Sequence, residues 1–507
     1  MGTVKTPSLS DYPVGSRPLS PQLQPEVAGA LREYCGALGI YSFSGEQVAH
    51  DIYLGLMNLQ HRGQDSAGAA VSDGKKISLV RELGYVAQVL DEKTLKTLPG
   101  HVGIGHVRYP TIGAGGKEDA QPFMQEAKGR TFAIAHNGNI ANYGRVKHAL
   151  EETGGKLCST CDVELMLALF VEEYDKTQDY FSAAEGMMKR VDGGYSVVMI
   201  TDSGDLIAFR DPQAIRPLCW GRTDDMIVFS SESVALDIIG CKLQGDVAPG
   251  EVVVVSKGEV TRKIVAPKVT PRHCMFEYVY FGRPDSKMDG KWIYEVRHRL
   301  GYLLAKAAPV KADIVVPVPD TARSAVAGYS EASGIPIAEG LIKNRYIART
   351  FIMPSQKKRQ EAIRLKLNPV RHVLEGKRVV LVDDSIVRGT TMGPIVNLMR
   401  DAGAKEIHIR ITCPPVIGPC FYGVDMPTYK ELVATRMSVD EIRKLIGADT
   451  LAYQTVDDLV KAMGRDRSEL CLGCVTEDYP TPFGREISKK IKAAGTKEGV
   501  RLWEEEG

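Results

Sequence analysis

One thirteen-residue run, residues 379–391, constrains the fold of this chain more than any other segment. It reads VVLVDDSIVRGTT: an apolar stretch typical of a buried strand, two acids, and a small, hydroxyl-rich loop that leads into a helix. This order is typical of a parallel α/β sheet, whose ligand sites lie beyond the carboxyl ends of its strands. The carboxylates of Asp383 and Asp384 are suited to ribose hydroxyls and a divalent metal ion. The loop N–H groups and hydroxyls are suited to a phosphate at the helix N-terminus.

The region around this run alternates between strand and helix from about residue 310 onward. One of its helices opens directly after Asp320. Such alternation predicts a parallel α/β domain, which we place at residues 290–475, followed by a C-terminal tail at residues 476–507. The predicted strands of this domain are residues 312–318, 335–340, 378–384 and 406–412.

The N-terminal half has a different pattern, with short apolar strands and amphipathic helices in no regular βαβ order. Mixed elements of this kind predict layered sheets faced by helices, an α+β domain that we place at residues 35–270. The chain is therefore predicted to have two domains. The predicted strands are residues 102–107, 132–136, 195–201, 226–230 and 250–256, and the predicted helices are residues 49–60 and 162–174.

Charge, hydropathy and cysteine content exclude several classes of protein. The net charge of the 507 residues is +1, so neither nucleic acid nor an acidic membrane surface is an expected partner. No apolar run approaches the ~18–20 residues that span a bilayer. Ten cysteines in a chain of this length do not indicate a disulfide scaffold. They favour a reducing compartment, and we expect a cytoplasmic enzyme with some thiols used for chemistry or metal.

Cys35 follows a segment that has the composition of a removable leader. Residues 1–34 are polar and contain five prolines, so they cannot bury much surface. If this predicted propeptide is removed, Cys35 carries both a thiol and a free α-amine. An α-amine has a pKa of about 7.7–8.0 and can accept the thiol proton near neutral pH. The alternative is a buried core cysteine behind a disordered tail.

Short polar motifs in the N-terminal half suggest a site for an amino acid amide. Arg108, at the end of a strand, can hold an α-carboxylate, and Asp162, in the first turn of a helix, can hold an α-ammonium group. Asn137 and the N–H of Gly138, in an expected tight turn at residues 136–140, can face the oxyanion of a tetrahedral intermediate. Taken singly, Arg108 could instead be a surface cation, Asp162 a helix cap and Asn137-Gly138 a hairpin turn.

Together the N-terminal motifs resemble the glutaminase domain of N-terminal-nucleophile amidotransferases. The resemblance rests on Cys35-Gly36, HRGQDSAG (61–68), GHVRY (105–109), HNGNI (136–140) and CDVE (161–164). It implies a four-layer αββα fold and a propeptide that is removed autocatalytically. It also implies a nucleophile, two glutamine clamps and an oxyanion hole, formed respectively by Cys35, by Arg108 and Asp162, and by Asn137 with Gly138. The leader is longer than is usual for this family, and Cys161 stands where a serine is expected.

The run at residues 379–391 resembles the phosphoribosylpyrophosphate signature of type I phosphoribosyltransferases, in the form found in amidophosphoribosyltransferases. The resemblance implies a Mg²⁺ ion held by Asp383 and Asp384, with Thr321 as a further contact. A basic stretch, residues 343–371, has nine Lys or Arg and one acid, and we interpret it as a lid over an anionic substrate rather than a solvated surface or a nucleic-acid patch. The implied substrate contacts are Asp320, Lys343, Arg345, Ser385, Arg388, Gly389, Thr390 and Thr391.

The pair Cys471 and Cys474 has metal-ligand spacing, which by itself suggests either zinc or an iron–sulfur site. The segments HCMFE (273–277) and PCFYG (419–423) resemble those of the amidophosphoribosyltransferase subgroup that carries a [4Fe–4S] cluster. This resemblance implies that Cys274 and Cys420 complete the ligand set of a structural cluster.

The family resemblance implies a complete reaction. Glutamine, phosphoribosylpyrophosphate and water give 5-phosphoribosylamine, pyrophosphate and glutamate, the first step of de novo purine synthesis, with ammonia passing between the two sites. It also implies a homotetramer inhibited by purine nucleotides. Two alternatives stay open: a different N-terminal-nucleophile amidotransferase, and a non-catalytic regulator with a phosphoribosyltransferase-like fold.

Overall fold

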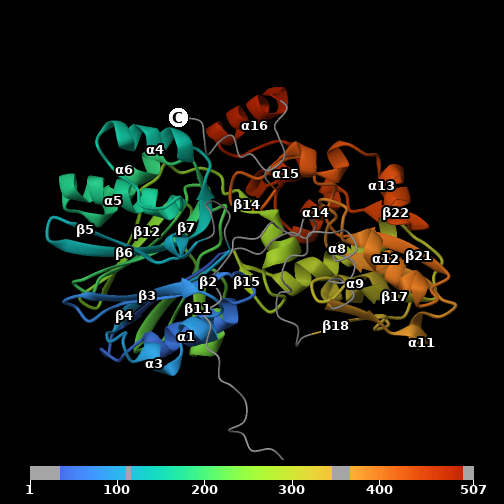
Figure 1. Ribbon diagram of the computed structural model, residues 1–507, viewed down its shortest axis with the longest axis horizontal. Helices are drawn as coiled ribbons and strands as arrows, with labels where there is room; N and C mark the ends of the chain where they lie inside the picture. Colours follow the sequence, from blue (N-terminus) through green and yellow to red (C-terminus); the bar gives the residue numbers. More distant parts are fainter. Residues whose placement is uncertain (1–34, 110–115, 345–365, 427, 495–507) are drawn as a thin grey trace, which may run out of the picture.

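The computed structural model describes residues 35–109, 116–344, 366–426 and 428–494, which form two domains lying side by side (Figure 1). The N-terminal domain contains two antiparallel sheets stacked face to face. In order across the sheet, the first comprises β11 (Lys242–Asp246), β9 (Cys219–Arg222), β10 (Met226–Ser230), β1 (Gly36–Ser42), β4 (Val102–Arg108), β2 (Ser66–Ser72) and β3 (Ile77–Leu83). The second comprises β13 (Glu259–Ile264), β12 (Glu251–Ser256), β8 (Leu206–Arg210), β7 (Gly193–Thr201), β6 (Arg130–Ile140) and β5 (Phe123–Ala127).

The alternation of side chains along these strands produces four layers. On β6, Ala133 and Ala135 point into the core between the sheets, whereas Phe132 and Ile134 point toward the helices. The predicted αββα fold is therefore confirmed. The first sheet is covered by α1 (Ala49–Leu59), α2 (Val86–Val89), α3 (Glu92–Leu95) and α7 (Val234–Ile239), and the second by α4 (Tyr143–Glu152), α5 (Asp162–Thr177) and α6 (Tyr180–Arg190).

The predicted tight turn at residues 136–140 is wrong, because the whole segment belongs to β6. Asn137 pairs with Ser196 and Gly138 with Tyr195 of β7. A Cβ on Gly138 would lie 2.1 Å from the carbonyl oxygen of Gly194. The glycine therefore serves a close approach of two strands, not a chain reversal.

The C-terminal domain is built on a four-stranded parallel sheet, as predicted. Its two faces are covered by different helices, because alternate residues of β20 pack against α8 and α9 or against α12 and α13. The sheet order is β17 (Ile314–Pro317), β20 (Arg378–Asp383), β21 (Glu406–Ile411) and β22 (Thr450–Tyr453). The covering helices are α8 (Ile293–Ala307), α9 (Arg323–Ser333), α12 (Met392–Asp401) and α13 (Val439–Ile446).

The strand predicted at residues 335–340 is wrong. Only Ile337 makes an isolated bridge, to Val315, and its side chain is 50% exposed. Pro336 has no N–H to give to a ladder, so the segment cannot join the parallel sheet as a regular strand. Regular strand pairing begins at Leu341, where β18 (Leu341–Lys343) forms a two-stranded sheet with β19 (Leu367–Pro369). The short helix α11 (Arg371–Leu374) follows β19.

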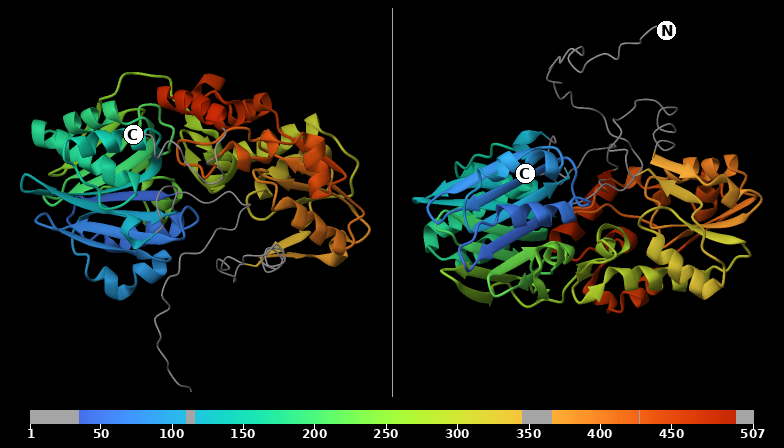
Figure 2. Two further views of the ribbon diagram at one scale, coloured as in Figure 1. Left: turned by 45° about the horizontal axis from the view of Figure 1, so that its top comes forward. Right: turned by 90° about the horizontal axis from the view of Figure 1, so that it is seen from below.

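A third set of elements joins the two domains. Helix α16 (Pro482–Ala494) lies over the junction in Figures 1 and 2 and buries Phe483, Ile487 and Ile491. The segment predicted as a tail therefore contributes to the core over these residues. The other joining elements are β14 (His273–Cys274), the π-helical turn η3 (Glu277–Phe281), β15 (Lys287–Met288), β16 (Lys291–Trp292), β23 (Leu470–Cys471) and α15 (Gly473–Thr476), whereas α14 (Val456–Met463) packs against α8 of the C-terminal domain. None of the helices within the described ranges is both long and apolar enough to cross a membrane.

Candidate functional site

Cys35 directly precedes β1, the central strand of the first sheet. Its side chain is buried, and its Sγ lies 3.7 Å from the carbonyl oxygen of Tyr109. Burial raises the pKa of the Cys35 thiol above its ordinary value, and the nearby Arg108 guanidinium offsets part of that rise. A thiol in this environment needs a base to become a nucleophile, which is the role expected of the α-amine that leader removal would free.

Asn137 lies beside Cys35, although the two come from different sheets. The Asn137 side chain is fully buried. With its amide nitrogen turned toward Cys35, it donates to the Cys35 carbonyl oxygen at 3.1 Å, and its amide oxygen accepts from Arg62 at 3.2 Å. A buried amide fixed from both sides is suited to hydrogen bonding a developing oxyanion.

The two predicted clamps also approach this point. Arg108 ends β4 as a buried cation whose guanidinium lies 3.8 Å from Asp119. Asp162 opens α5, where its carboxylate accepts from the N–H of Ile140 at 3.1 Å and lies 3.3 Å from Nε2 of His136. Burial opposes ionisation of Asp162, but His136 and the hydrogen bonds outweigh it and hold the pKa of the carboxyl below its usual value. Asp162 is thus an anion at neutral pH, as an ammonium clamp must be.

Cys161 occupies the N-cap position of α5 without a side-chain capping bond. Its Sγ accepts from the Gln121 amide at 3.7 Å and lies 3.9 Å from Asp162. Burial raises the pKa of the Cys161 thiol to about 12, so it stays neutral beside the clamps.

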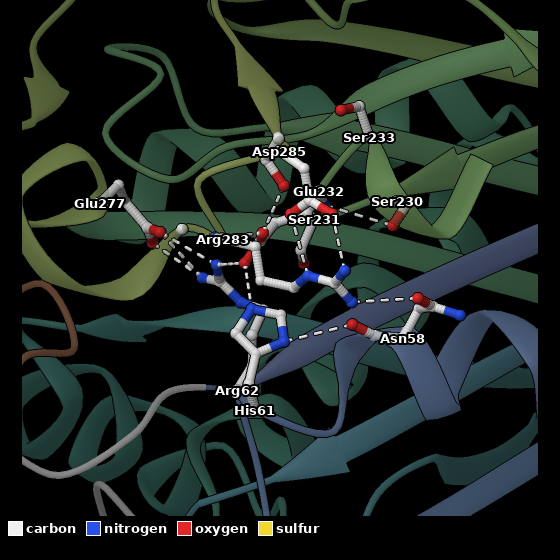
Figure 3. A network of polar contacts seen from close by, with 12 residues as sticks. Asn58, His61, Arg62, Ser230, Ser231, Glu232, Ser233, Glu277, Arg283 and Asp285 are labelled. Carbon is white, nitrogen blue, oxygen red and sulfur yellow. Dashed lines mark hydrogen bonds and ion pairs between the residues drawn. The ribbon is translucent and has the colours of Figure 1, made fainter. Parts of the chain in front are cut away.

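A buried ion network that sequence reasoning missed supports this site (Figure 3). Arg62 donates from Nε to the Cys35 carbonyl at 3.0 Å and forms ion pairs with Glu232 and Glu277. Arg62 stands in a motif that the sequence singles out, but Glu277 follows it by 215 positions. No local pattern indicates that partnership.

The second site lies at the carboxyl end of β20. The carboxylate of Asp384 accepts from the hydroxyl of Thr321 at 2.5 Å and from that of Ser385 at 2.6 Å. Burial raises the pKa of Asp383 well above its ordinary value, with the charge of Asp384 adding to the effect, and burial likewise raises the pKa of Asp384. The structure thus brings together the three predicted metal contacts, and two adjacent carboxylates of raised pKa gain most from a divalent cation.

The remaining predicted phosphate contacts are arranged around this end of the sheet. Lys343 lies 3.2 Å from the carboxylate of Asp320. Arg388 is turned toward Glu431 and Asp425, at 2.7 Å and 3.7 Å, so its guanidinium anchors the loop to neighbouring acids. Gly389 has φ +76°, Thr390 follows it, and Thr391 takes the N-cap position of α12. Arg345 lies outside the described residues.

The four predicted cluster cysteines come together at the junction. Cys274 of β14 pairs with Cys471 of β23, and the pKa of Cys474, raised mainly by burial, is raised further by Cys420 and Cys471. The Sγ of Cys420 accepts the N–H groups of Tyr422 and Val424, both at 3.4 Å.

Within the part of the chain that the structure describes, no three His, Cys, Asp or Glu side chains converge as ligands of a single metal ion. A cubane cluster instead takes four cysteine ligands around a larger centre, and N–H···S bonds tune such ligands. The donor set therefore fits an iron–sulfur cluster in its chemistry.

Fold and sites together define a glutamine amidotransferase joined to a phosphoribosyltransferase. Two family models match accordingly, a glutamine amidotransferase domain at residues 107–237 and a phosphoribosyl transferase domain at residues 294–419. The chain is 47% identical to the amidophosphoribosyltransferase of Methanothermobacter thermautotrophicus, over 90% of this chain and 97% of that protein. It is 42% identical to the Bacillus subtilis amidophosphoribosyltransferase, over 90% and 96%.

A solved structure gives the same result. Glutamine phosphoribosylpyrophosphate amidotransferase from B. subtilis, complexed with ADP and GMP, has a TM-score of 0.82 and 40% identity, covering 89% of this chain and 98% of that one. The chain belongs to the amidophosphoribosyltransferase family. It is an enzyme of the first step of purine biosynthesis that uses glutamine and phosphoribosylpyrophosphate, and neither alternative function is favoured.

Proposed function

We propose that Cys35 is the nucleophile that releases ammonia from glutamine. The observation that carries the proposal is the convergence of Cys35, which directly precedes β1, with Arg108 of β4, Asn137 of β6 and Asp162 of α5. Arg108 and Asp162 hold the α-carboxylate and α-ammonium groups, which leaves the side-chain amide of glutamine toward the sulfur.

The α-amine freed on Cys35 takes the thiol proton, and the sulfur adds to the amide carbon. The Asn137 amide and the Gly138 N–H stabilise the oxyanion that forms. Collapse of the tetrahedral intermediate breaks the C–N bond, the protonated amine returns its proton to the leaving nitrogen, and ammonia departs. Water then cleaves the γ-glutamyl thioester to glutamate and restores the thiol.

The ammonia adds to the anomeric carbon of phosphoribosylpyrophosphate as pyrophosphate leaves. We assign the ribose hydroxyls to Asp383 and Asp384 and the 5-phosphate to the loop Ser385–Thr391, with Asp320, Lys343, Arg345 and Arg388 as further substrate or loop contacts. Asp383, Asp384 and Thr321 are the residues that would hold Mg²⁺, which would supply charge neutralisation for the departing pyrophosphate. Ammonia must travel in a protected interior path, because protonation in bulk water would make it unreactive.

We further propose that Cys274, Cys420, Cys471 and Cys474 are the residues that would hold a [4Fe–4S] cluster, which would supply a structural cross-link between the domain junction and the C-terminal segment. Ten cysteines in a chain of 507 residues, without the composition of a disulfide scaffold, suit the reducing environment of the cytoplasm. The ADP and GMP bound to the B. subtilis enzyme favour purine nucleotides as feedback inhibitors of this chain too, acting on a homotetramer. Residues 1–34 are proposed to be a propeptide, with domains at 35–270 and 290–475.

Cys35→Ala tests the separation of the two sites. It is expected to abolish glutamine-dependent synthesis of 5-phosphoribosylamine, while synthesis from free ammonia continues. The assay follows glutamate and pyrophosphate, with glutamine or ammonium chloride as the nitrogen source. Loss of both activities in a folded Cys35→Ala protein would contradict the two-site assignment.

A further inference from the structure

Two arginines and two glutamates form a buried ion network beneath the glutamine site, drawn in part in Figure 3. Arg62 pairs with Glu232 at 2.5 Å and with Glu277 at 2.9 Å, and Arg216 pairs with Glu277 at 2.9 Å. The side chains of all four residues are at most 2% exposed. Ion pairs buried in this way add little net stability on average, so stability alone does not account for the network.

One end of the network contacts the glutaminase machinery. Arg62 donates to the carbonyl oxygen of Cys35 at 3.0 Å and to the amide oxygen of Asn137 at 3.2 Å. Two nitrogens of the same guanidinium bind Glu277, in a fork that fixes the plane of the Arg62 head group. Glu277 therefore fixes the position of the Arg62 guanidinium, which contacts both Cys35 and the oxyanion donor Asn137.

The other end of the network belongs to the junction between domains. Glu277 begins η3, the turn that leads toward α8 of the phosphoribosyltransferase domain. Arg216 binds Glu277 and also donates from Nε to the carbonyl oxygen of Tyr422, at 2.8 Å. Nearby, Asn139 of β6 donates to the carbonyl oxygen of Phe421 at 2.9 Å. Segments from the C-terminal half thus reach the strand that carries Asn137.

We propose that Glu277 is a positioning residue for glutamine hydrolysis: it holds Arg62, and through Arg62 it holds the Cys35 carbonyl and the Asn137 amide in the geometry of the oxyanion hole. The rate of glutamine hydrolysis then depends on correct packing of the segments that form the junction between the two domains. Phosphoribosyl transfer from free ammonia does not use these groups. The inference rests on the proposed role of Cys35 as nucleophile.

The test compares Glu277→Gln with wild type in two assays. Glutamine keeps the shape of the side chain but cannot form the charged fork. We expect the kcat of glutamine hydrolysis to fall roughly 10- to 100-fold, as for a small misplacement of catalytic groups. The KM for glutamine should change less than about 3-fold, because Arg108 and Asp162 still bind the substrate. Ammonia-dependent synthesis should stay within about 2-fold of wild type.

Two further variants test whether Glu277 acts by positioning Arg62. Arg216→Lys loosens Glu277 from its other side, and it should lower the same kcat by a smaller factor, while Glu277→Asp should restore part of the loss caused by Glu277→Gln. The matched control is Glu251→Gln, which removes another buried carboxylate, one bound by the arginine fork of Arg262 at the start of β12 in the second sheet, and it should leave both activities unchanged.

Unchanged glutamine turnover in Glu277→Gln would overturn the proposal. Equal loss of both activities in Glu277→Gln and Arg216→Lys would also overturn it, since the network would then only support folding. Wild-type protein and Cys35→Ala run beside them report on the proposed function itself. If wild type releases no glutamate, or Cys35→Ala still does, the assignment of the nucleophile fails independently of Glu277.

Discussion

Replacing Asn137 by alanine removes one of two proposed donors to the oxyanion. Loss of a single oxyanion donor costs about 2.7–4 kcal/mol of transition-state stabilisation, which is a 10²- to 10³-fold decrease in kcat. Arg62 loses its hydrogen bond to Asn137 but keeps two carboxylate partners, so no unpaired buried charge adds to this cost. We expect glutamine hydrolysis to slow by that factor, with KM for glutamine little changed because the clamps remain.

The assay measures glutamate release over a range of glutamine concentrations, alongside synthesis from ammonium chloride. The matched control is Asn142→Ala, a nearby amide that donates to the Arg190 carbonyl at 2.9 Å and accepts from the Asp192 N–H at 2.9 Å. It should alter kcat by less than about 3-fold, because it removes structural bonds only. If Asn137→Ala keeps kcat within that same range, the oxyanion assignment is wrong.

Two further predictions concern the metal sites. Asp384→Asn should abolish synthesis of 5-phosphoribosylamine from glutamine and from free ammonia alike, yet raise the unfolding temperature of metal-free protein at pH 7. Burial raises the folded-state pKa of Asp384, so stability is lost as pH rises from the ordinary carboxyl pKa of about 3.9 through that raised value, and the advantage of the variant should vanish below about pH 4. Differential scanning calorimetry across pH measures this, and a variant less stable than wild type at pH 7 would refute it. Protein purified without oxygen should be brown and carry about four irons per chain, with iron lost in Cys471→Ser; colourless protein loaded with zinc would refute the cluster.

The local sequence was sufficient to predict those strands and helices that end or begin at a functional residue within one short motif. The apolar run before Asp383 and Asp384 indicates a buried strand, and β20 ends where its first acid stands. The same holds for β4, which ends at Arg108, and for α5, which begins at Asp162. These residues carry most of the candidate site, so its members could be named in advance.

Elsewhere one short sequence was compatible with two different local structures. Asn137-Gly138 is a common turn sequence, but here glycine lets two strands approach closely, which depends on Gly194, far along the chain. Helix α16 could have been found, since Phe483, Ile487 and Ile491 recur at four-residue spacing on one buried face.

The pairing of Arg62 with Glu277 could not have been predicted. Partners 215 positions apart leave no periodic or motif signal in a single sequence. The register of two domains against each other, and hence the network beneath the oxyanion site, is a property of tertiary packing.

The most direct test of the proposed activation of Cys35 is to measure the mass and identify the first residue of the catalytically active chain. A thiol whose pKa is raised by burial depends on an adjacent amine for activation. Active enzyme is therefore predicted to begin at Cys35, with residues 1–34 absent. Full glutamine-dependent activity in a homogeneous preparation that still carries Met1 would contradict the proposal that the α-amine of Cys35 activates its thiol.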